Sequence, residues 1–175
     1  MNDEHTRARF EGLMVPLMKD AYNLARWLMR NEEDAQDAVQ ESYLRAFRFF
    51  EGFHPGANAR HWLLQIVRNT CYTALSARHR HEAAPEPDVE ALEDAAPDPR
   101  ASLETKATVE AVRQAIAALP VDYREVVVLR ELEGLSYREI AEVAGIPLGT
   151  VMSRLSRARD QLHLLLQERK AHDHL

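Results

Sequence analysis

The chain has 175 residues, of which 46% are hydrophobic and 7% aromatic, and its net charge is −6. This length suits one domain or two small ones, and the composition is sufficient for a packed core. No apolar run approaches the roughly 18–20 residues of a membrane span, and the charged N-terminus has no hydrophobic signal segment. The single cysteine, Cys71, has no partner for an internal disulfide. We therefore expect a cytoplasmic protein without membrane insertion.

The negative charge is concentrated in one stretch. Residues 82–104 carry one Arg against eight Asp or Glu, whereas residues 1–81 have a net charge of +1 and residues 105–175 a net charge of 0. The prolines and acids of this stretch oppose helix and core formation. The sequence therefore predicts two domains, residues 1–82 and 105–175, joined by a flexible acidic linker at 83–104.

Both predicted domains are helical, so the expected fold class is all-α. Apolar periodicity and capping residues predict helices at about 8–30, 32–51, 59–81, 103–118, 120–133, 136–143 and 147–168, with a loop at 53–58. In the second helix, which Asn31 caps, Val39, Tyr43, Ala46, Phe47 and Phe50 are expected on one inward stripe. In the third helix, Trp62 and Ile66 are expected to face inward.

Charged residues are polarised along these helices. Residues 31–44 contain five acids and no basic residue, whereas residues 59–81 contain four Arg and residues 143–159 three Arg, both without an acid. The two basic segments favour two nucleic-acid contacts. The acidic residues form a ridge opposite the apolar stripe, and a solvated face, a carboxylate pair and a metal site are alternatives for it. The ridge consists of Asp34, Asp37, Gln40 and Glu41.

The segment SYREIAEVAGIPLGTVMSRLSRAR (136–159) has the features of a helix-turn-helix. Ser136 and Glu139 fit a capping box, Gly145 fits a turn that needs positive φ, and Pro147 suits the first turn of the next helix. In that helix a core stripe is predicted, with the opposite face free for a DNA major groove; a helical hairpin that merely packs is the alternative. The stripe is Val151, Leu155, Ala158 and Leu162, and the free face includes Gly149, Met152, Ser153, Ser156 and Arg157.

Together with NEEDAQDAVQESYLRAF (31–47) and FHPGANARHWLLQIVRNTCYTALSARHR (53–80), the helix-turn-helix resembles the two-domain pattern of bacterial RNA polymerase sigma factors of the extracytoplasmic-function (ECF) class. The resemblance covers most of residues 10–80 and 105–165. It implies an alternative, signal-responsive factor in transcription initiation, whose first domain binds core RNA polymerase and the −10 promoter element and whose second domain binds the −35 element. It also implies an anti-sigma factor as a further partner.

The resemblance assigns site residues to three surfaces. Docking on the polymerase β′ clamp would use Asp34, Asp37, Gln40 and Glu41. At the −10 element, bases would meet Phe53, Asn58, Asn69 and Thr73, and phosphates would meet Arg60, Arg68, Arg78 and Arg80. At the −35 element, bases would meet Ser153, Ser156 and Arg157, and phosphates would meet Thr150, Arg154 and Arg159. Met152 stands there at a position where many relatives carry a basic residue.

Several alternatives stay open on the sequence alone. Trp62 is either a core residue or a wedge that opens the duplex, and Cys71 is either a buried small residue or a redox group. We find no phosphate-cradling glycine loop, no nucleophile with a base and no chelating histidine spacing, so no enzyme, cofactor or metal is predicted. An autonomous helix-turn-helix regulator that binds DNA as a dimer, and a helical adaptor that binds only proteins, are the competing functions.

Overall fold

The computed structural model describes residues 2–81, 100 and 102–174, and every regular element in these residues is helical. The all-α prediction is therefore confirmed. Most of the predicted linker, residues 83–99 and 101, lies outside the described residues. None of the described helices is both long enough and apolar enough to cross a membrane.

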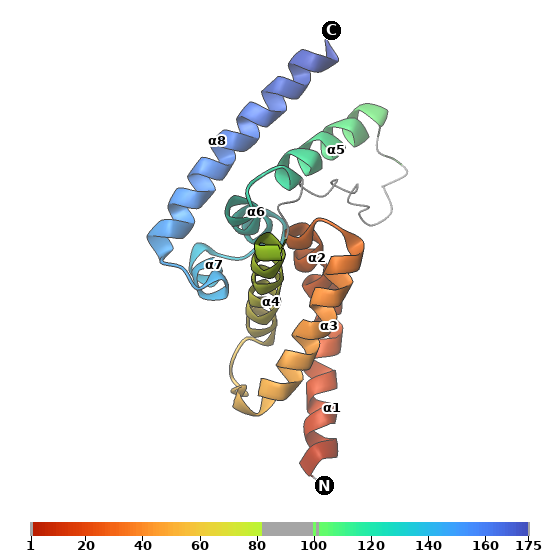
Figure 1. Cartoon of the computed structure of the whole chain (residues 1–175), viewed down its shortest axis with the longest axis vertical. Coiled ribbons are helices and arrows are strands. Elements are labelled where there is room, and N and C mark those ends of the chain that lie inside the picture. Colours follow the sequence, from red (N-terminus) through yellow and green to blue (C-terminus); the bar gives the residue numbers. More distant parts are fainter. Residues whose placement is uncertain (1, 82–99, 101, 175) are drawn as a thin grey trace.

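The first domain is a helical unit built around three mutually packed helices, α2, α3 and α4 (Figure 1). Its elements are α1 (Asn2–Met14), the 3-10 turn η1 (Val15–Leu17), α2 (Met18–Met29), α3 (Glu32–Phe49), the 3-10 turn η2 (Phe50–Gly52) and α4 (Ala59–His81). The prediction of one helix over residues 8–30 is wrong. Pro16 lies in η1, where it interrupts the helix because proline has no backbone N–H to donate and its ring clashes with the preceding turn.

The core of this domain contains Leu24, Leu28, Leu63, Leu64 and Val67, each at most 1% exposed. Helix α3 begins as predicted, because the Asn31 side chain accepts a hydrogen bond from the Asp34 backbone N–H at 2.8 Å.

The predicted inward stripe of α3 is confirmed for Val39, Ala46 and Phe50, which are buried, and for Tyr43, which is partly buried. It is wrong for Phe47, which is 47% exposed. A helix turns by about 100° per residue, so the residue after buried Ala46 lies at the edge of the stripe. There the Phe47 ring meets the Phe10 ring edge-on at 5.2 Å. Trp62 is partly buried and packs on Phe50 and Phe53, as the core interpretation predicted.

The second domain contains α5 (Leu103–Ala117), α6 (Val121–Val127), a π-helical segment η3 (Val128–Leu132), α7 (Tyr137–Ala144) and α8 (Leu148–Asp173). The helix predicted at 120–133 therefore changes from α to π geometry at Val128, and the last helix continues beyond its predicted end at 168. Its core includes Leu129, Ile140, Val151 and Leu155, each at most 1% exposed.

The two domains contact each other through α2 and α4 of the first domain and α6 and α7 of the second. Helix α7 packs against α4, and α6 packs against α2, while α5 and α8 point away from the first domain (Figure 1). The first helix of the helix-turn-helix therefore rests on the helix that carries the predicted −10 residues. The helix-turn-helix and the predicted −10 surface are therefore next to each other in the structure.

Candidate nucleic-acid interface

The helix-turn-helix is built by local signals that the sequence contains. Ser136 Oγ accepts from the Glu139 backbone N–H at 3.2 Å, and Glu139 Oε1 accepts from the Ser136 backbone N–H at 2.9 Å. These hydrogen bonds confirm the capping box, and donation from the Ser136 backbone N–H to the Glu139 carboxylate lowers the pKa of that carboxyl. Gly145 ends α7 with φ at 67°, as the turn requires. Pro147 occupies the N-cap position just before α8, where its carbonyl accepts from the Val151 backbone N–H at 3.1 Å.

Helix α8 is held by one face and leaves the other open. Val151, Leu155 and Ala158 are at most 1% exposed and anchor the helix in the core. The helical period then leaves five of the seven predicted −35 residues exposed, and these are Met152, Ser153, Ser156, Arg157 and Arg159. Among the flanking residues, Thr150 and Arg154 are half-buried, and Arg159 lies 3.5 Å from Glu131 in a surface ion pair. The open face fits a major groove.

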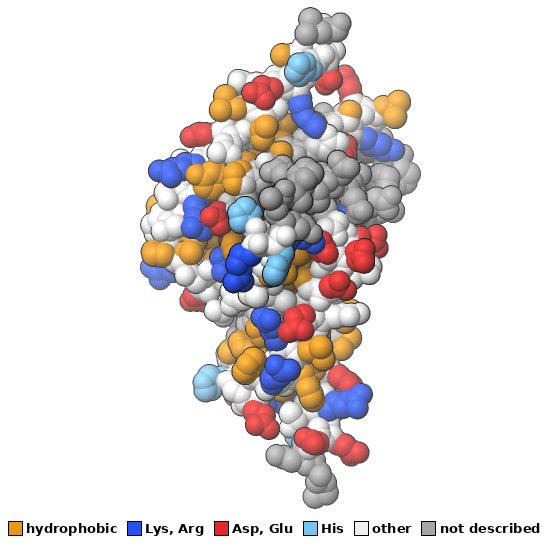
Figure 2. Space-filling view, viewed as in Figure 1, with side chains coloured by type: hydrophobic (Ala, Val, Ile, Leu, Met, Phe, Trp, Pro, Cys, Tyr) orange, Lys and Arg blue, Asp and Glu red, His pale blue; other side chains and the backbone are white. Residues whose placement is uncertain are grey.

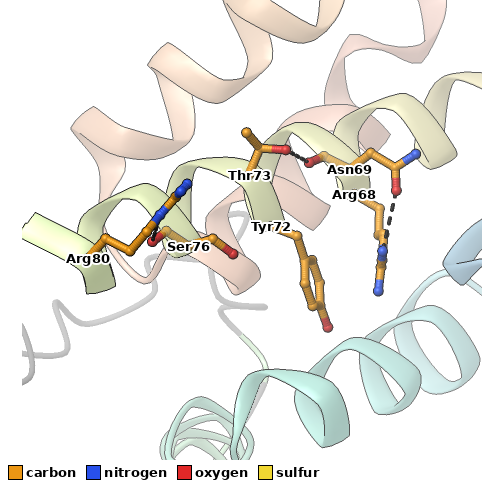
Figure 3. A pocket seen from close by; sticks show the side chains of 6 residues that line it. All are labelled: Arg68, Asn69, Tyr72, Thr73, Ser76 and Arg80. Carbon is orange, nitrogen blue, oxygen red and sulfur yellow. Dashed lines mark hydrogen bonds between the residues drawn. The ribbon is translucent and has the colours of Figure 1, made fainter.

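Helix α4 carries a second polar surface, a hollow of about 380 Å³ (Figure 3). It brings together four predicted −10 residues, Arg68, Asn69, Thr73 and Arg80, with two that the sequence analysis missed, Tyr72 and Ser76. A signal for the missed residues exists: positions 68, 72, 76 and 80 recur every four residues, which places them along one side of a helix. Arginine, hydroxyl and amide groups in one hollow are suited to phosphates and unstacked bases.

Two side chains of this hollow are already engaged by the second domain. The side chains of Arg68 and Tyr72 point from α4 toward α6 (Figure 3). Arg68 Nε donates to Glu125 Oε1 at 2.6 Å, the Tyr72 hydroxyl donates to Glu125 Oε2 at 2.6 Å, and the Arg68 guanidinium lies 3.8 Å from the centre of the Tyr72 ring. Burial disfavours the charged form of Arg68, but the hydrogen bond and charge of Glu125 outweigh it and raise the pKa of Arg68.

Arg60 is engaged in the same way at the other end of the contact. Its guanidinium donates to Asp20 Oδ2 at 2.9 Å within the first domain. It also donates to the backbone carbonyl of Glu133 at 2.9 Å and to Glu133 Oε2 at 2.7 Å in the second domain. In this arrangement Arg60 is bound to carboxylates, and not free for the phosphates that the sequence analysis assigned to it.

Three further predicted −10 residues have partners inside the first domain. Phe53 is only 5% exposed, and its ring stacks parallel to Phe50 at 5.7 Å, so the ring belongs to the aromatic core. Asn58 accepts at its side-chain oxygen from the His61 backbone N–H at 3.1 Å, which caps the start of α4. Arg78 pairs with Asp34. Asn58 nevertheless stays exposed, whereas Phe53 presents no free ring face here.

The acidic ridge is open over three of its four residues. Asp37, Gln40 and Glu41 are exposed on α3, and Figure 2 shows acidic side chains gathered over the N-terminal half of that helix. Asp34 is half-buried; burial favours its neutral form, but hydrogen bonds from Arg78 and Asn31 outweigh this and lower its pKa. The exposed ridge therefore consists of Asp37, Gln40 and Glu41, of which Glu41 accepts from Arg45 Nε one helical turn away at 2.9 Å, while Asp34 ties α3 to α4.

Comparison with known proteins decides the family. Residues 13–81 match the family described as Sigma-70 region 2, and residues 109–162 match the one described as Sigma-70, region 4. The chain is also 37% identical over 162 residues to the ECF RNA polymerase sigma factor SigM of Mycobacterium tuberculosis, an alignment that covers 91% of this chain and 78% of SigM. The chain is a member of the ECF class of RNA polymerase sigma factors.

Other relatives agree with this membership. The sigma factor is 36% identical to the RNA polymerase sigma-H factor of Pseudomonas aeruginosa, with 90% of this chain and 86% of the relative covered. It is 37% identical to the ECF RNA polymerase sigma factor SigE of Mycolicibacterium smegmatis, but spans only 55% of the length of that relative. A dimeric helix-turn-helix regulator and a protein-binding adaptor are therefore not favoured.

Solved structures match the fold across both domains. The sigma factor RpoE in complex with the anti-sigma factor NepR, from Bartonella quintana, matches with a TM-score of 0.74 and 28% identity over 91% of this chain and 97% of RpoE. CnrH, solved with the cytosolic domain of CnrY, matches in fold with a TM-score of 0.64 and 24% identity. The RpoE match therefore covers both domains of this chain.

Proposed function

We propose that this sigma factor binds core RNA polymerase through the acidic ridge and directs initiation at promoters that it reads with α4 and α8. The observation that carries the proposal is the presence of two separate polar and basic faces, one on each domain, each on a helix that also has buried apolar residues. One rigid helix per promoter element is what recognition of two separate elements requires.

At the −35 element, α8 enters the major groove. Arg157 is exposed and suits bidentate donation to a guanine, and Ser153 and Ser156 suit either donors or acceptors on base edges. Thr150, Arg154 and Arg159 lie beside this face and contact phosphates. Met152 is 53% exposed and offers an apolar contact to a thymine methyl group.

At the −10 element, the hollow on α4 holds a displaced single strand. Asn69, Thr73 and Arg80 are exposed there, and the other groups of the hollow are arginine, tyrosine and serine side chains. Such a set binds phosphates through charge and bases through stacking and hydrogen bonds. Asn58 is the last residue of the loop that precedes α4.

In this proposal the polymerase binds to the exposed ridge of Asp37, Gln40 and Glu41. Complementary charge on a basic surface of the clamp would steer the encounter, and the exposed position of the ridge leaves it available. The protein acts in this proposal as a cytoplasmic binding subunit without catalytic groups of its own. An anti-sigma factor is a proposed further partner, supported by the likeness to RpoE, which was solved in complex with one.

The test combines polymerase binding with transcript mapping. The purified chain is mixed with core RNA polymerase, run on gel filtration, and used to transcribe a genomic template. We expect co-elution and discrete start sites, from which the −10 and −35 sequences follow. A chain that neither co-elutes with the polymerase nor yields discrete starts would refute the proposed function.

Charge reversal locates the docking surface. Asp37→Lys combined with Glu41→Lys should abolish co-elution, because both substitutions repel a basic partner. Glu4→Lys combined with Glu11→Lys is the matched control, since these acids are also exposed and lie on α1 instead of α3. If the ridge variant co-elutes like the control, the ridge is a solvated face and the polymerase binds elsewhere.

A further inference from the structure

The second domain presents carboxylates to the predicted −10 face of α4. Glu125, on α6, is fully buried and bonds both Arg68 and Tyr72. Glu133, whose side chain is 6% exposed, holds Arg60. These pairs join residues 57 and 73 positions apart in the sequence, so they form only when the two domains are closed on each other.

A carboxylate can replace a phosphate in these contacts. Arginine donates to either anion through the same pair of N–H groups, and a tyrosine hydroxyl donates equally to both. Arg68 and Tyr72 line the hollow together with Asn69, Thr73, Ser76 and Arg80. The anion that the second domain supplies therefore takes up donors that a bound DNA strand would need.

From these contacts we infer that the second domain masks the −10 face in the free chain. Its carboxylates Glu125 and Glu133 occupy the donors of α4 that would otherwise hold the phosphates of single-stranded DNA. Promoter binding then requires the two domains to separate. This inference rests on the proposed function of α4 as the −10 reader.

The contact between the two domains includes charged side chains as well as apolar ones. Each domain has residues at most 1% exposed, and the buried apolar cluster continues from one domain to the other. The contact between them is rich in ion pairs, and paired charges regain water on separation, which offsets much of the loss of their attraction. Arg124 adds a further polar link, because it donates to Leu119 O at 2.6 Å in its own domain and to Leu28 O at 3.2 Å in the other. Relative motion of two domains in one chain is the default expectation unless the interface between them is large and hydrophobic.

The mask leaves other surfaces accessible. Asp37 and Glu41 on α3, and Ser156 and Arg157 on α8, are exposed while the domains are closed. Polymerase can therefore approach the ridge of the closed chain, whereas the −10 strand must first displace Glu125. The order of events in this scheme is docking, opening and then strand binding.

The first experiment weakens the closed state in the full chain. Spin labels at Arg48→Cys on α3 and Glu168→Cys on α8, with Cys71→Ala to remove the native thiol, report the distance between the domains. The variant Glu125→Gln with Glu133→Gln keeps side-chain volume but removes both charges. We expect the distance distribution to shift to longer values, and a labelled single-stranded −10 oligonucleotide to bind about tenfold more tightly or better, because the binding-competent fraction rises.

Glu131→Gln is the control. Glu131 lies in the π-helical segment η3, which contacts α2 of the first domain. Its side chain is nevertheless 56% exposed and pairs with Arg159 of its own domain. It should leave both the distance and the affinity unchanged. Thermal unfolding by circular dichroism confirms that each variant is folded.

A second arm closes the domains without removing any buried charge. His61 and Glu139 face each other across the contact, with Nε2 and Oε2 2.7 Å apart. In the Cys71→Ala background, His61→Cys and Glu139→Cys are joined by a bismaleimide whose spacer a reductant cleaves. The crosslinked chain should bind the oligonucleotide at least about tenfold less tightly than the same chain after cleavage.

Two results would overturn the mask. One is an unchanged distance and affinity in the Glu125→Gln, Glu133→Gln variant, and the other is equal oligonucleotide binding before and after cleavage of the crosslink. The distance measurement needs neither DNA nor polymerase. Failure of the proposed function, which would appear as absent co-elution and absent starts, is therefore distinguished from failure of the mask.

Discussion

Two glycines in the helix-turn-helix should respond to the same chemical change with opposite signs. Gly145 ends α7 in the left-handed region, with φ at 67°, and its backbone N–H donates to Ala141 O. Gly149 lies in the first turn of α8, outside the glycines of positive φ. An added methyl group meets no other atom within 4 Å at either position, so steric contact with neighbours does not separate them. Only the backbone conformation differs.

The magnitudes follow from that difference. Alanine in the left-handed region costs about 1–2 kcal/mol, whereas loss of glycine's freedom in the unfolded chain returns about 0.4–1 kcal/mol. Gly145→Ala should therefore destabilise the second domain by about 1 kcal/mol. At Gly149 the conformation suits alanine, so Gly149→Ala should stabilise it by about 0.4–1 kcal/mol.

Urea unfolding of the full chain, followed by far-UV circular dichroism, measures both effects. The midpoint should fall for Gly145→Ala and rise for Gly149→Ala, with the denaturant slope unchanged. For a domain of this size, 1 kcal/mol corresponds to about 4–8 °C in melting temperature. Shifts of the same sign in both variants, or a Gly145→Ala chain as stable as the original, would refute the assignment of the turn to positive φ.

Three other outcomes are expected. Arg157→Ala should weaken holoenzyme binding at the −35 element by about 1–3 kcal/mol and relax base preference there, and unchanged discrimination among −35 variants would contradict the role. Burial, assisted by the charge of Glu125, raises the pKa of Cys71 to about 12, so a thiol reagent at pH 8 should label the folded chain about a thousandfold more slowly than the urea-unfolded chain. The Tyr43 hydroxyl donates to Met14 O at 2.6 Å, and Tyr43→Phe should cost about 1 kcal/mol in urea unfolding at neutral pH. Burial, with the charge of Asp20, raises the pKa of Tyr43 to about 12, above its unfolded value of about 10. The contribution of Tyr43 to the free energy of unfolding is therefore complete below pH 10 and is lost as the pH rises toward 12. The Tyr43→Phe variant should not show this part of the decrease in stability at alkaline pH.

Local signals explain which parts of the fold were predictable. The start of α3 at Asn31, the bounds of α4, the capping box at Ser136 and the turn at Gly145 each depend on residues within about four positions of one another. The split of the first helix was also readable, because Pro16 stands in the sequence. The exposed face of α8 follows from helical periodicity alone, which fixes Val151 and Leu155 inward and Ser156 and Arg157 outward.

The sequence by itself determined an all-α chain with two candidate DNA-reading helices and an acidic ridge, because periodicity and capping act along the chain. Only the tertiary structure decided what those side chains touch. Arg60 and Arg68 meet carboxylates 73 and 57 positions away, and Arg78 meets Asp34 across the first domain. A charge in the sequence indicates what a residue can bind, but the packing of distant helices selects the partner, since ion pairs form between whichever opposite charges the fold brings within hydrogen-bond distance.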